Sequence, residues 1–171
     1  NLAALDVARR VGATRLVSTL RTLGFGATVD ETEHGAGVVL GGVSASPFEL
    51  ARAYLVLARG GTAVEPSSTP VDAREGTRSL DPDASALVTD VLSDPDARRL
   101  GFGDDLRTLS PAAPFALKTG TSPAFRDAWA AVYDAELLVV VWVGDPRGRP
   151  LDGVAGFVNA APTAVSILEA A

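Results

Sequence analysis

The length, composition and charge of the chain limit what it can be. It has 171 residues, of which 47% are hydrophobic, so it forms one folded domain or part of one, with a substantial core. Its net charge of -6 and its scattered basic residues argue against nucleic acid as a main partner. The absence of cysteine excludes a disulfide framework and a thiolate metal site.

The first part of the chain is predicted to be helical. Residues 2–10 and 13–23 carry apolar residues near helical spacing, each followed by glycine, and Thr14 is the expected N-cap of the second helix. Residues 24–37 are predicted to be a glycine-rich, acidic loop. No strand precedes it and no Gly-Lys-Ser/Thr follows, so it does not fit a phosphate-binding loop. Its His34 is interpreted as a solvated surface residue and not as a general base.

The strongest helix start signal in the chain lies at residues 46–49. Ser46 is a good N-cap, Pro47 suits the first helical position and Glu49 completes a capping box. The helix should end at Gly60-Gly61, with a short strand at 62–64 after it. Its buried face is expected to consist of Leu50, Ala53, Tyr54 and Leu57.

A further helix is predicted to begin after Asp81, with Pro82 at its first position, and to end at Asp94-Pro95. Residues 95–114 are expected to be irregular. Within them Asp104-Asp105 is interpreted as solvated loop, because adjacent acids point apart and no further metal ligands lie nearby. The buried face of the helix is expected to consist of Leu87, Val88, Val91 and Leu92.

The last third of the chain is predicted to form three strands and a closing helix. The strands begin near residue 115, run over 126–134 and over 137–143, and the helix covers 161–170. The third strand is apolar on both faces and should have a neighbour on each edge. The sequence offers only one neighbour for it, the second strand, so the sheet is expected to lack strands. The helix should pack on the sheet through Ala164, Val165 and Leu168.

The first of these strands carries an unusual polar sequence, Lys118-Thr119-Gly120-Thr121. Lys118 is the single lysine of a chain with fourteen arginines, which favours a site that needs a compact ammonium group. A glycine inside a strand marks a close approach of another group. Because hydroxyls flank Gly120 and a cation precedes it, the approaching group should be an anion or a carbonyl. The alternative is an ordinary edge strand with a few polar residues.

These residues resemble a known family. Lys118-Thr119-Gly120-Thr121 followed by Phe125-Arg126-Asp127-Ala128-Trp129 is similar to the Lys-Thr-Gly strand and the next strand of penicillin-binding proteins. The segment 40–61 resembles the region between the second and third motifs of class A (bifunctional) penicillin-binding proteins, and the whole is most like the 1C type. Pro123 departs from the family pattern, and this departure bears on the shape of the loop and not on the family.

The resemblance implies an α+β fold of the penicillin-binding protein/β-lactamase type, present in part. Residues 1–171 would be the C-terminal portion of a transpeptidase domain, with a mostly helical part over 1–114 and antiparallel strands plus a closing helix over 115–171. The missing strands would then precede Asn1. Because the chain starts without Met or a signal peptide, we expect a piece of a longer protein, whose export signal or membrane anchor would lie upstream.

The resemblance also implies acyl-serine chemistry, with the nucleophile on a Ser-x-x-Lys motif. No serine here has a lysine three residues later, so the nucleophile is expected upstream and the 171 residues alone are predicted to be inactive. Asn1 is interpreted as the last residue of the family's Ser-x-Asn motif. The alternative for Asn1 is an ordinary helix cap.

By resemblance, each residue of the strand has a role. Lys118 would supply positive potential beside the nucleophile, and the hydroxyls of Thr119 and Thr121 would bind the terminal carboxylate of a D-Ala-D-Ala stem peptide or of a β-lactam. Gly120 would let the acyl group lie against the strand, and the Thr121 N–H would be one of two oxyanion donors. Asn1 would hydrogen-bond the substrate amide. No metal or cofactor is implied.

Neighbouring residues are given structural roles. Arg126 and Asp127 are expected to pair with each other or with the scaffold, and Trp129 to be core. The resemblance places the protein in the cell envelope, at the outer face of the cytoplasmic membrane, with peptidoglycan stem peptide, β-lactams and the remainder of the domain as partners. Two alternatives are a non-catalytic peptide-carboxylate binding module or degenerate homologue, and a β-lactamase-type serine hydrolase.

Overall fold

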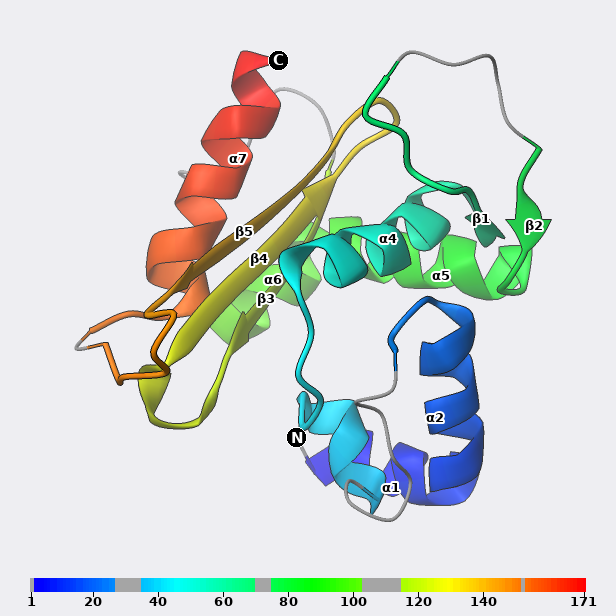
Figure 1. The fold of residues 1–171 in the computed structure, drawn as a ribbon, viewed down its shortest axis with the longest axis horizontal. Coiled ribbons are helices and arrows are strands. Elements are labelled where there is room, and N and C mark those ends of the chain that lie inside the picture. The colour runs from blue at the N-terminus through cyan, green and yellow to red at the C-terminus, as the bar shows by residue number, and fades with distance from the viewer. Residues whose placement is uncertain (1, 27–34, 70–74, 103–114, 152) are drawn as a thin grey trace. The chain divides into compact units, whose positions relative to one another are not determined.

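The computed structural model describes residues 2–26, 35–69, 75–102, 115–151 and 153–171, which Figure 1 shows as a ribbon. Three predictions fall outside these residues: the role of Asn1, the surface position of His34 and the solvated loop at Asp104-Asp105. The predicted division of the chain after residue 114 stays a prediction.

The chain divides into two compact units, Asn1–Ala53 and Tyr54–Ala171. Among its described residues the first unit contains three helical segments and the start of a fourth: α1 (Leu2–Val11), α2 (Ala13–Thr22), the 3-10 helix η1 (Gly35–Leu40) and α4 (Pro47–Ala58). The two predicted N-terminal helices are therefore confirmed. Gly12, with a φ of 88°, makes the sharp turn between them and is the N-cap of α2. The predicted cap Thr14 is wrong, because it already lies inside the first helical turn.

The core of the first unit is built from the predicted stripe of α2 and from residues outside it. Val17 is buried together with Phe25, Val38 and Ala53, and the half-buried leucines of α2 pack around them. Val38 belongs to η1, which begins inside the segment predicted to be loop. A short apolar 3-10 helix therefore contributes to this core beside the longer helices.

Helix α4 begins with the predicted capping box. The Ser46 amide donates to the Glu49 carboxylate at 2.8 Å, and the Glu49 amide donates to Ser46 Oγ at 3.2 Å. The Ser46 hydroxyl also donates to the Glu49 carboxylate at 2.8 Å, and the two hydrogen bonds from the Ser46 amide and hydroxyl hold the pKa of Glu49 below its usual value. Gly60 and Gly61, with φ values of 58° and 90°, end the helix as expected. Ala53, which the pattern placed on the buried face, is buried. Val56 is also buried, although the pattern did not place it there.

The helical part of the second unit differs from the prediction in two places. Helix α5 (Pro82–Ser93) is capped as expected, because Asp81 Oδ1 accepts from the Ala84 amide at 2.9 Å. A helix follows where irregular structure was predicted: α6 (Pro95–Phe102). Asp94 Oδ1 accepts from the Asp96 amide at 2.8 Å, so the Asp-Pro pair that ends α5 also starts α6.

The predicted buried face of α5 is wrong at three of its four positions, and Leu92 alone of the four is half-buried. Leu87, Val88 and Val91 are 64%, 42% and 55% exposed. The inward face instead carries Ser85, which is 1% exposed, and Thr89, whose hydroxyl lies 2.9 Å from that of Tyr133. The apolar stripe was the stronger sequence signal, but hydrogen-bonded hydroxyls occupy the inner side.

The described part of the second unit contains two sheets. The predicted short strand at 62–64 is β1 (Thr62–Ala63), and it pairs with β2 (Thr77–Arg78), which was not predicted. The larger sheet has the order β3-β4-β5 and is antiparallel throughout. Its strands match the predicted ones to within a residue or two: β3 (Ala116–Thr121), β4 (Asp127–Tyr133) and β5 (Leu138–Gly144).

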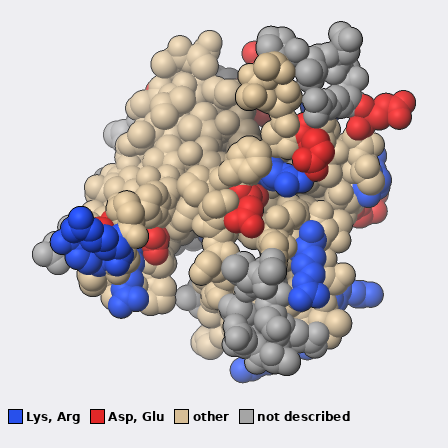
Figure 2. All heavy atoms as spheres, in the orientation of Figure 1, with Lys and Arg blue, Asp and Glu red and all other residues tan. Residues whose placement is uncertain are grey.

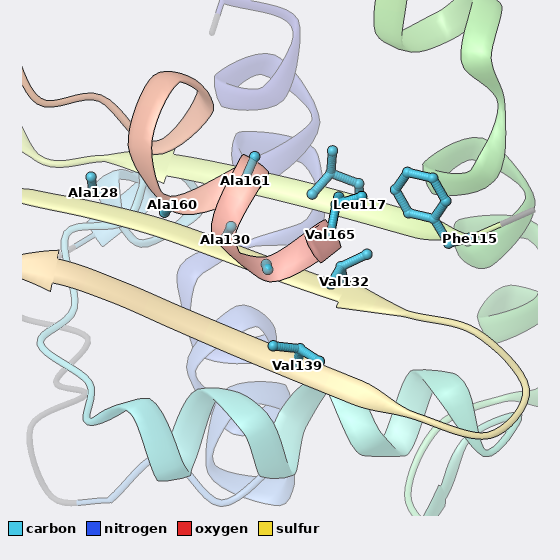
Figure 3. Packing of buried hydrophobic residues seen from close by; sticks show 10 residues of the cluster. Phe115, Leu117, Ala128, Ala130, Val132, Val139, Ala160, Ala161 and Val165 are labelled. Carbon is cyan, nitrogen blue, oxygen red and sulfur yellow. The ribbon is translucent and has the colours of Figure 1, made fainter. Parts of the chain in front are cut away.

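The closing helix α7 (Ala161–Ala170) packs on one face of the larger sheet, as predicted (Figures 1 and 3). A single π-helical turn, η4 (Gly156–Ala160), precedes it and was not predicted. Small side chains meet at this contact: Ala128, Ala130, Ala160, Ala161 and Ala164 are all 0% exposed. Side chains of this size let the helix backbone approach the sheet closely. None of the helices in the described part of the chain is long and apolar enough to cross a membrane.

Candidate functional site

The candidate site lies on β3, where the strand alternation separates four consecutive residues. Lys118 and Gly120 lie on the same face as their cross-strand partners Ala131 and Trp129. Thr119 and Thr121 lie on the opposite face with Leu117, which is buried against the α7 side. Strand β3 is an edge of the described sheet, since β4 is its one partner there.

The Lys118 ammonium is held against the strand. Its Nζ donates to the Thr119 carbonyl oxygen at 2.6 Å. The side chain is exposed by surface area, yet protein atoms surround the ammonium closely enough that desolvation lowers its pKa from the ordinary lysine value.

Neither the backbone conformation nor the packing of the described residues requires a glycine at position 120. Its φ lies outside the left-handed region, and a Cβ built there would make an ordinary contact of 3.6 Å with the Trp129 Cβ and meet nothing else within 4 Å in the described chain. Neither backbone strain nor close packing within these residues explains the glycine. The open space beside it is therefore available to a ligand or to another protein segment.

Thr121 makes a hydrogen bond that the sequence did not predict. Its Oγ1 accepts from the Gly156 amide at 3.0 Å, across 35 positions of the chain. A hydroxyl has one donor and two acceptor positions, so Thr121 can still donate its proton to a further acceptor. The glycine before a predicted helix was the one available signal for Gly156, and it does not identify the partner.

The turn between β3 and β4 is a closed and strained loop. Ser122 and Asp127 join its ends, with the Ser122 amide donating to the Asp127 carbonyl at 2.9 Å and the Asp127 amide donating to Ser122 Oγ at 2.8 Å. Between them Ala124 and Phe125 have φ values of 58° and 54°. Such a conformation costs a residue with a side chain roughly 1–3 kcal/mol. Pro123, the departure from the family pattern, begins the 3-10 turn in this loop.

Asp127 is bound to the scaffold, which is one of the two outcomes predicted for it. Its Oδ1 accepts from Trp142 Nε1 at 2.9 Å. The Trp142 ring lies 6.1 Å from that of Trp129, centroid to centroid. Trp129 is half-buried and not fully part of the core. Sequence reasoning missed Trp142, although an indole N–H in a strand needs a partner and the β4–β5 register brings Asp127 near it.

Charge is mixed on the face of the molecule that Figure 2 shows, with a group of basic residues over the loops at one end of the larger sheet. These loops contain Arg126, Arg147 and Arg149, and Arg149 forms an ion pair with Asp145. Among the described residues no three histidine, aspartate or glutamate side chains gather as a metal site. The chemistry that the described residues offer is that of hydroxyls, one ammonium and open backbone.

The chain is similar to a known protein family and to a named protein. The family model of the penicillin binding protein transpeptidase domain matches residues 1–145. Penicillin-binding protein 1C of Escherichia coli (strain K12) is 31% identical over 163 residues, which are 95% of this chain and 20% of that protein.

A solved structure agrees with the predicted fold. The crystal structure of penicillin-binding protein 1A from Haemophilus influenzae matches 99% of this chain and 32% of its own, with a TM-score of 0.80 and 20% identity. The chain thus spans a fifth to a third of these two relatives. The predicted α+β fold is confirmed, and the chain belongs to the family of penicillin-binding protein transpeptidase domains.

Proposed function

We propose that this chain carries the substrate-binding strand of a peptidoglycan D,D-transpeptidase that works through an acyl-serine intermediate. The observation that carries the proposal is the edge strand β3 of the described sheet, on which Lys118, Thr119, Gly120 and Thr121 follow one another in a chain of this family. The proposed ligands are D-Ala-D-Ala stem peptides, and β-lactams that present a similar carboxylate and acyl group. The proposed location is the outer face of the cytoplasmic membrane.

An edge strand suits an extended peptide. A stem peptide lying along β3 can use backbone groups of the strand that no other strand of the described sheet occupies. The space beside Gly120 lets the acyl group approach the backbone. Thr119 and Thr121 then donate hydroxyl protons to the terminal carboxylate, with Lys118 adding positive potential nearby.

The reaction needs a serine hydroxyl that these residues do not supply, because no Ser-x-x-Lys occurs among the 171 residues. In the proposed reaction that serine oxygen attacks the carbonyl carbon of the penultimate D-Ala, and its proton passes to a base. The Thr121 N–H stabilises the oxyanion that forms. The peptide C–N bond then breaks, the leaving D-Ala takes up a proton, and an amine of a second stem peptide displaces the serine from the acyl group.

Peptide mapping after reaction with penicillin tests the proposal. The natural protein that carries these residues is incubated with a penicillin, digested and analysed by mass spectrometry. We expect one acylated serine outside the 171 residues, and no acylation of the 171 residues on their own. No acyl mass in the natural protein would favour a non-catalytic binding module, and an acylated serine inside the 171 residues would overturn the proposed division of the site.

The rate of deacylation distinguishes a transpeptidase from a β-lactamase. A transpeptidase should keep the penicilloyl group for much longer than the mixing time, whereas a β-lactamase hydrolyses its acyl-enzyme quickly. Following the acyl mass over time in the natural protein distinguishes them. A penicillin that is turned over many times per protein molecule would contradict the transpeptidase assignment.

A further inference from the structure

The start of the C-terminal helical segment lies directly on the candidate substrate strand. Gly156 is buried, and a Cβ built there would lie 2.6 Å from the Trp129 carbonyl oxygen and closer still to that of Gly120. Real Cβ atoms do not come so near a backbone oxygen. Gly120 and Trp129 are cross-strand partners, so the backbone at position 156 covers one rung of the β3–β4 ladder.

A hydrogen bond joins the same position to the site. The Gly156 amide donates to Thr121 Oγ1 at 3.0 Å. The side chain of threonine is stiff about χ1 because it branches at Cβ, and this bond favours the rotamer that keeps Oγ1 on the Gly156 side. One lone pair of the hydroxyl is thereby used, and its single proton is left to donate to another acceptor.

The element that carries Gly156 is fixed to the sheet. Asn159 closes the π turn, since its Oδ1 accepts from the Ala155 amide at 3.0 Å and its own amide donates to the Ala155 carbonyl at 3.0 Å. The turn ends at Ala160 and runs without a break into α7, which begins at Ala161, and both alanines are fully buried on the sheet. The position of Gly156 is therefore set by the packing of α7 and not by a free loop. Single π turns occur often at functional sites.

We propose that Gly156 is a positioning residue for substrate binding. Its amide holds the Thr121 hydroxyl so that the hydroxyl proton is directed to the carboxylate of the bound peptide. Because Gly156 has no side chain, the segment before α7 can pack directly on the strand backbone and hold Gly120 and Thr121 in the position that substrate binding requires. The part of this proposal that concerns the carboxylate rests on the proposed function, whereas the link between Gly156 and Thr121 does not.

Hydrogen exchange tests the link without any catalysis. In the natural protein, Thr121→Val keeps the branched shape of the side chain but removes the acceptor, and Thr119→Val is the matched control two positions away on the same face of the strand. We expect the Gly156 amide to exchange up to about tenfold faster in Thr121→Val, the loss of one hydrogen bond. It should be unchanged in Thr119→Val, and Thr121→Ser should restore the protection. Equal exchange in both valine variants would overturn the link.

Acylation kinetics test the positioning role. In the natural protein, Gly156→Ala should lower the second-order rate of penicillin acylation by about 10- to 100-fold, because misplacement of an active-site group by an ångström has effects of this size. The loss should appear mainly in the initial binding constant. Gly37→Ala is the matched control, because its φ lies outside the left-handed region and a Cβ there meets nothing within 4 Å.

Two outcomes separate the proposals. A wild-type protein that is not acylated refutes the proposed function, and the exchange experiment then still decides the link. Normal acylation in a folded Gly156→Ala protein, with an unchanged unfolding temperature, would overturn the positioning role. If Gly156→Ala does not fold, Thr121→Val decides in its place: the binding constant should weaken more than in Thr119→Val, and an equal weakening would contradict us.

Discussion

The two faces of the β3–β5 sheet are built from the same strands by different rules. The face under α7 is apolar and small, with Ala128, Ala130 and Val132 fully buried (Figure 3). The opposite face carries a cation and aromatic rings, among them Lys118 and Trp129. Because side chains alternate along a strand, one stretch of sequence serves as scaffold on one side and offers chemistry on the other. Within β4, the effect of a change should therefore depend on the parity of its position, whereas β3 carries the candidate ligand-binding residues Thr119 and Thr121 on the α7 side as well.

The largest expected effect on stability comes from overpacking the α7 face. Ala130 is 0% exposed beneath α7, and Ala130→Leu should lower the free energy of unfolding by about 3 kcal/mol, since extra methylenes force backbone shifts. Ala135→Leu, in the exposed β4–β5 turn, should change it by less than about 0.5 kcal/mol. Thermal or urea unfolding measures both. Equal effects at the two positions would show that α7 does not pack on β4 as described.

The stability of the opposite face should depend on pH through Tyr54. Burial, and to a lesser degree the neighbouring Tyr133, raises the pKa of Tyr54 to about 12, and the two rings lie 6.4 Å apart. The raised pKa means that the unfolded chain loses the Tyr54 proton first, near pH 10. The stability is therefore complete below about pH 10 and falls as the pH rises toward 12, by roughly 1–2 kcal/mol.

Tyr54→Phe should remove this fall, so the difference between the two unfolding curves isolates Tyr54 from other groups. Lys118 is one of these groups. Because its pKa is lowered in the folded protein, its contribution to the stability rises with pH below the ordinary lysine pKa, which is the opposite of the effect of Tyr54. Parallel curves for the wild type and Tyr54→Phe up to pH 12 would show that Tyr54 is not buried.

A smaller effect is expected at the edge of the same face. Asp127→Ala leaves Trp142 Nε1 without its partner and should cost about 1–2 kcal/mol, the penalty for a half-buried unsatisfied donor. Asp127→Asn keeps an acceptor oxygen and should lose less. Tryptophan fluorescence and urea unfolding check the pair. If Asn destabilises as much as Ala, the negative charge of Asp127 matters and not its hydrogen bond.

Local signals made much of this fold predictable. The capping box at Ser46 and Glu49, the Asp81-Pro82 start and the alternating strands each lie within a few residues, and each was found. Helix α6 was missed because Asp94-Pro95 was interpreted only as an end, although it repeats the start signal of α5. The wrong face was assigned to α5 because its apolar stripe says nothing about the hydroxyls that face inward.

The candidate site divides in the same way. Lys118 to Thr121 are contiguous and could be recognised from the sequence, whereas Gly156 and Trp142 join them only through contacts across many residues. Their partners depend on strand register and on where α7 lies on the sheet. The pattern of a glycine before a helix is common, so no local signal distinguishes Gly156 from an ordinary turn.

The most direct test of the account is the rate of penicillin acylation in the natural protein with Lys118→Ala, compared with Arg147→Ala. Arg147 is an exposed cation in the turn after β5, so its removal controls for the loss of a positive charge. We predict that Lys118→Ala lowers the rate at least about 100-fold, as expected for an electrostatic group at the reacting centre, while its unfolding temperature stays normal and Arg147→Ala reacts at the wild-type rate. A Lys118→Ala protein that is acylated at the normal rate would contradict the assignment of β3 as the substrate strand.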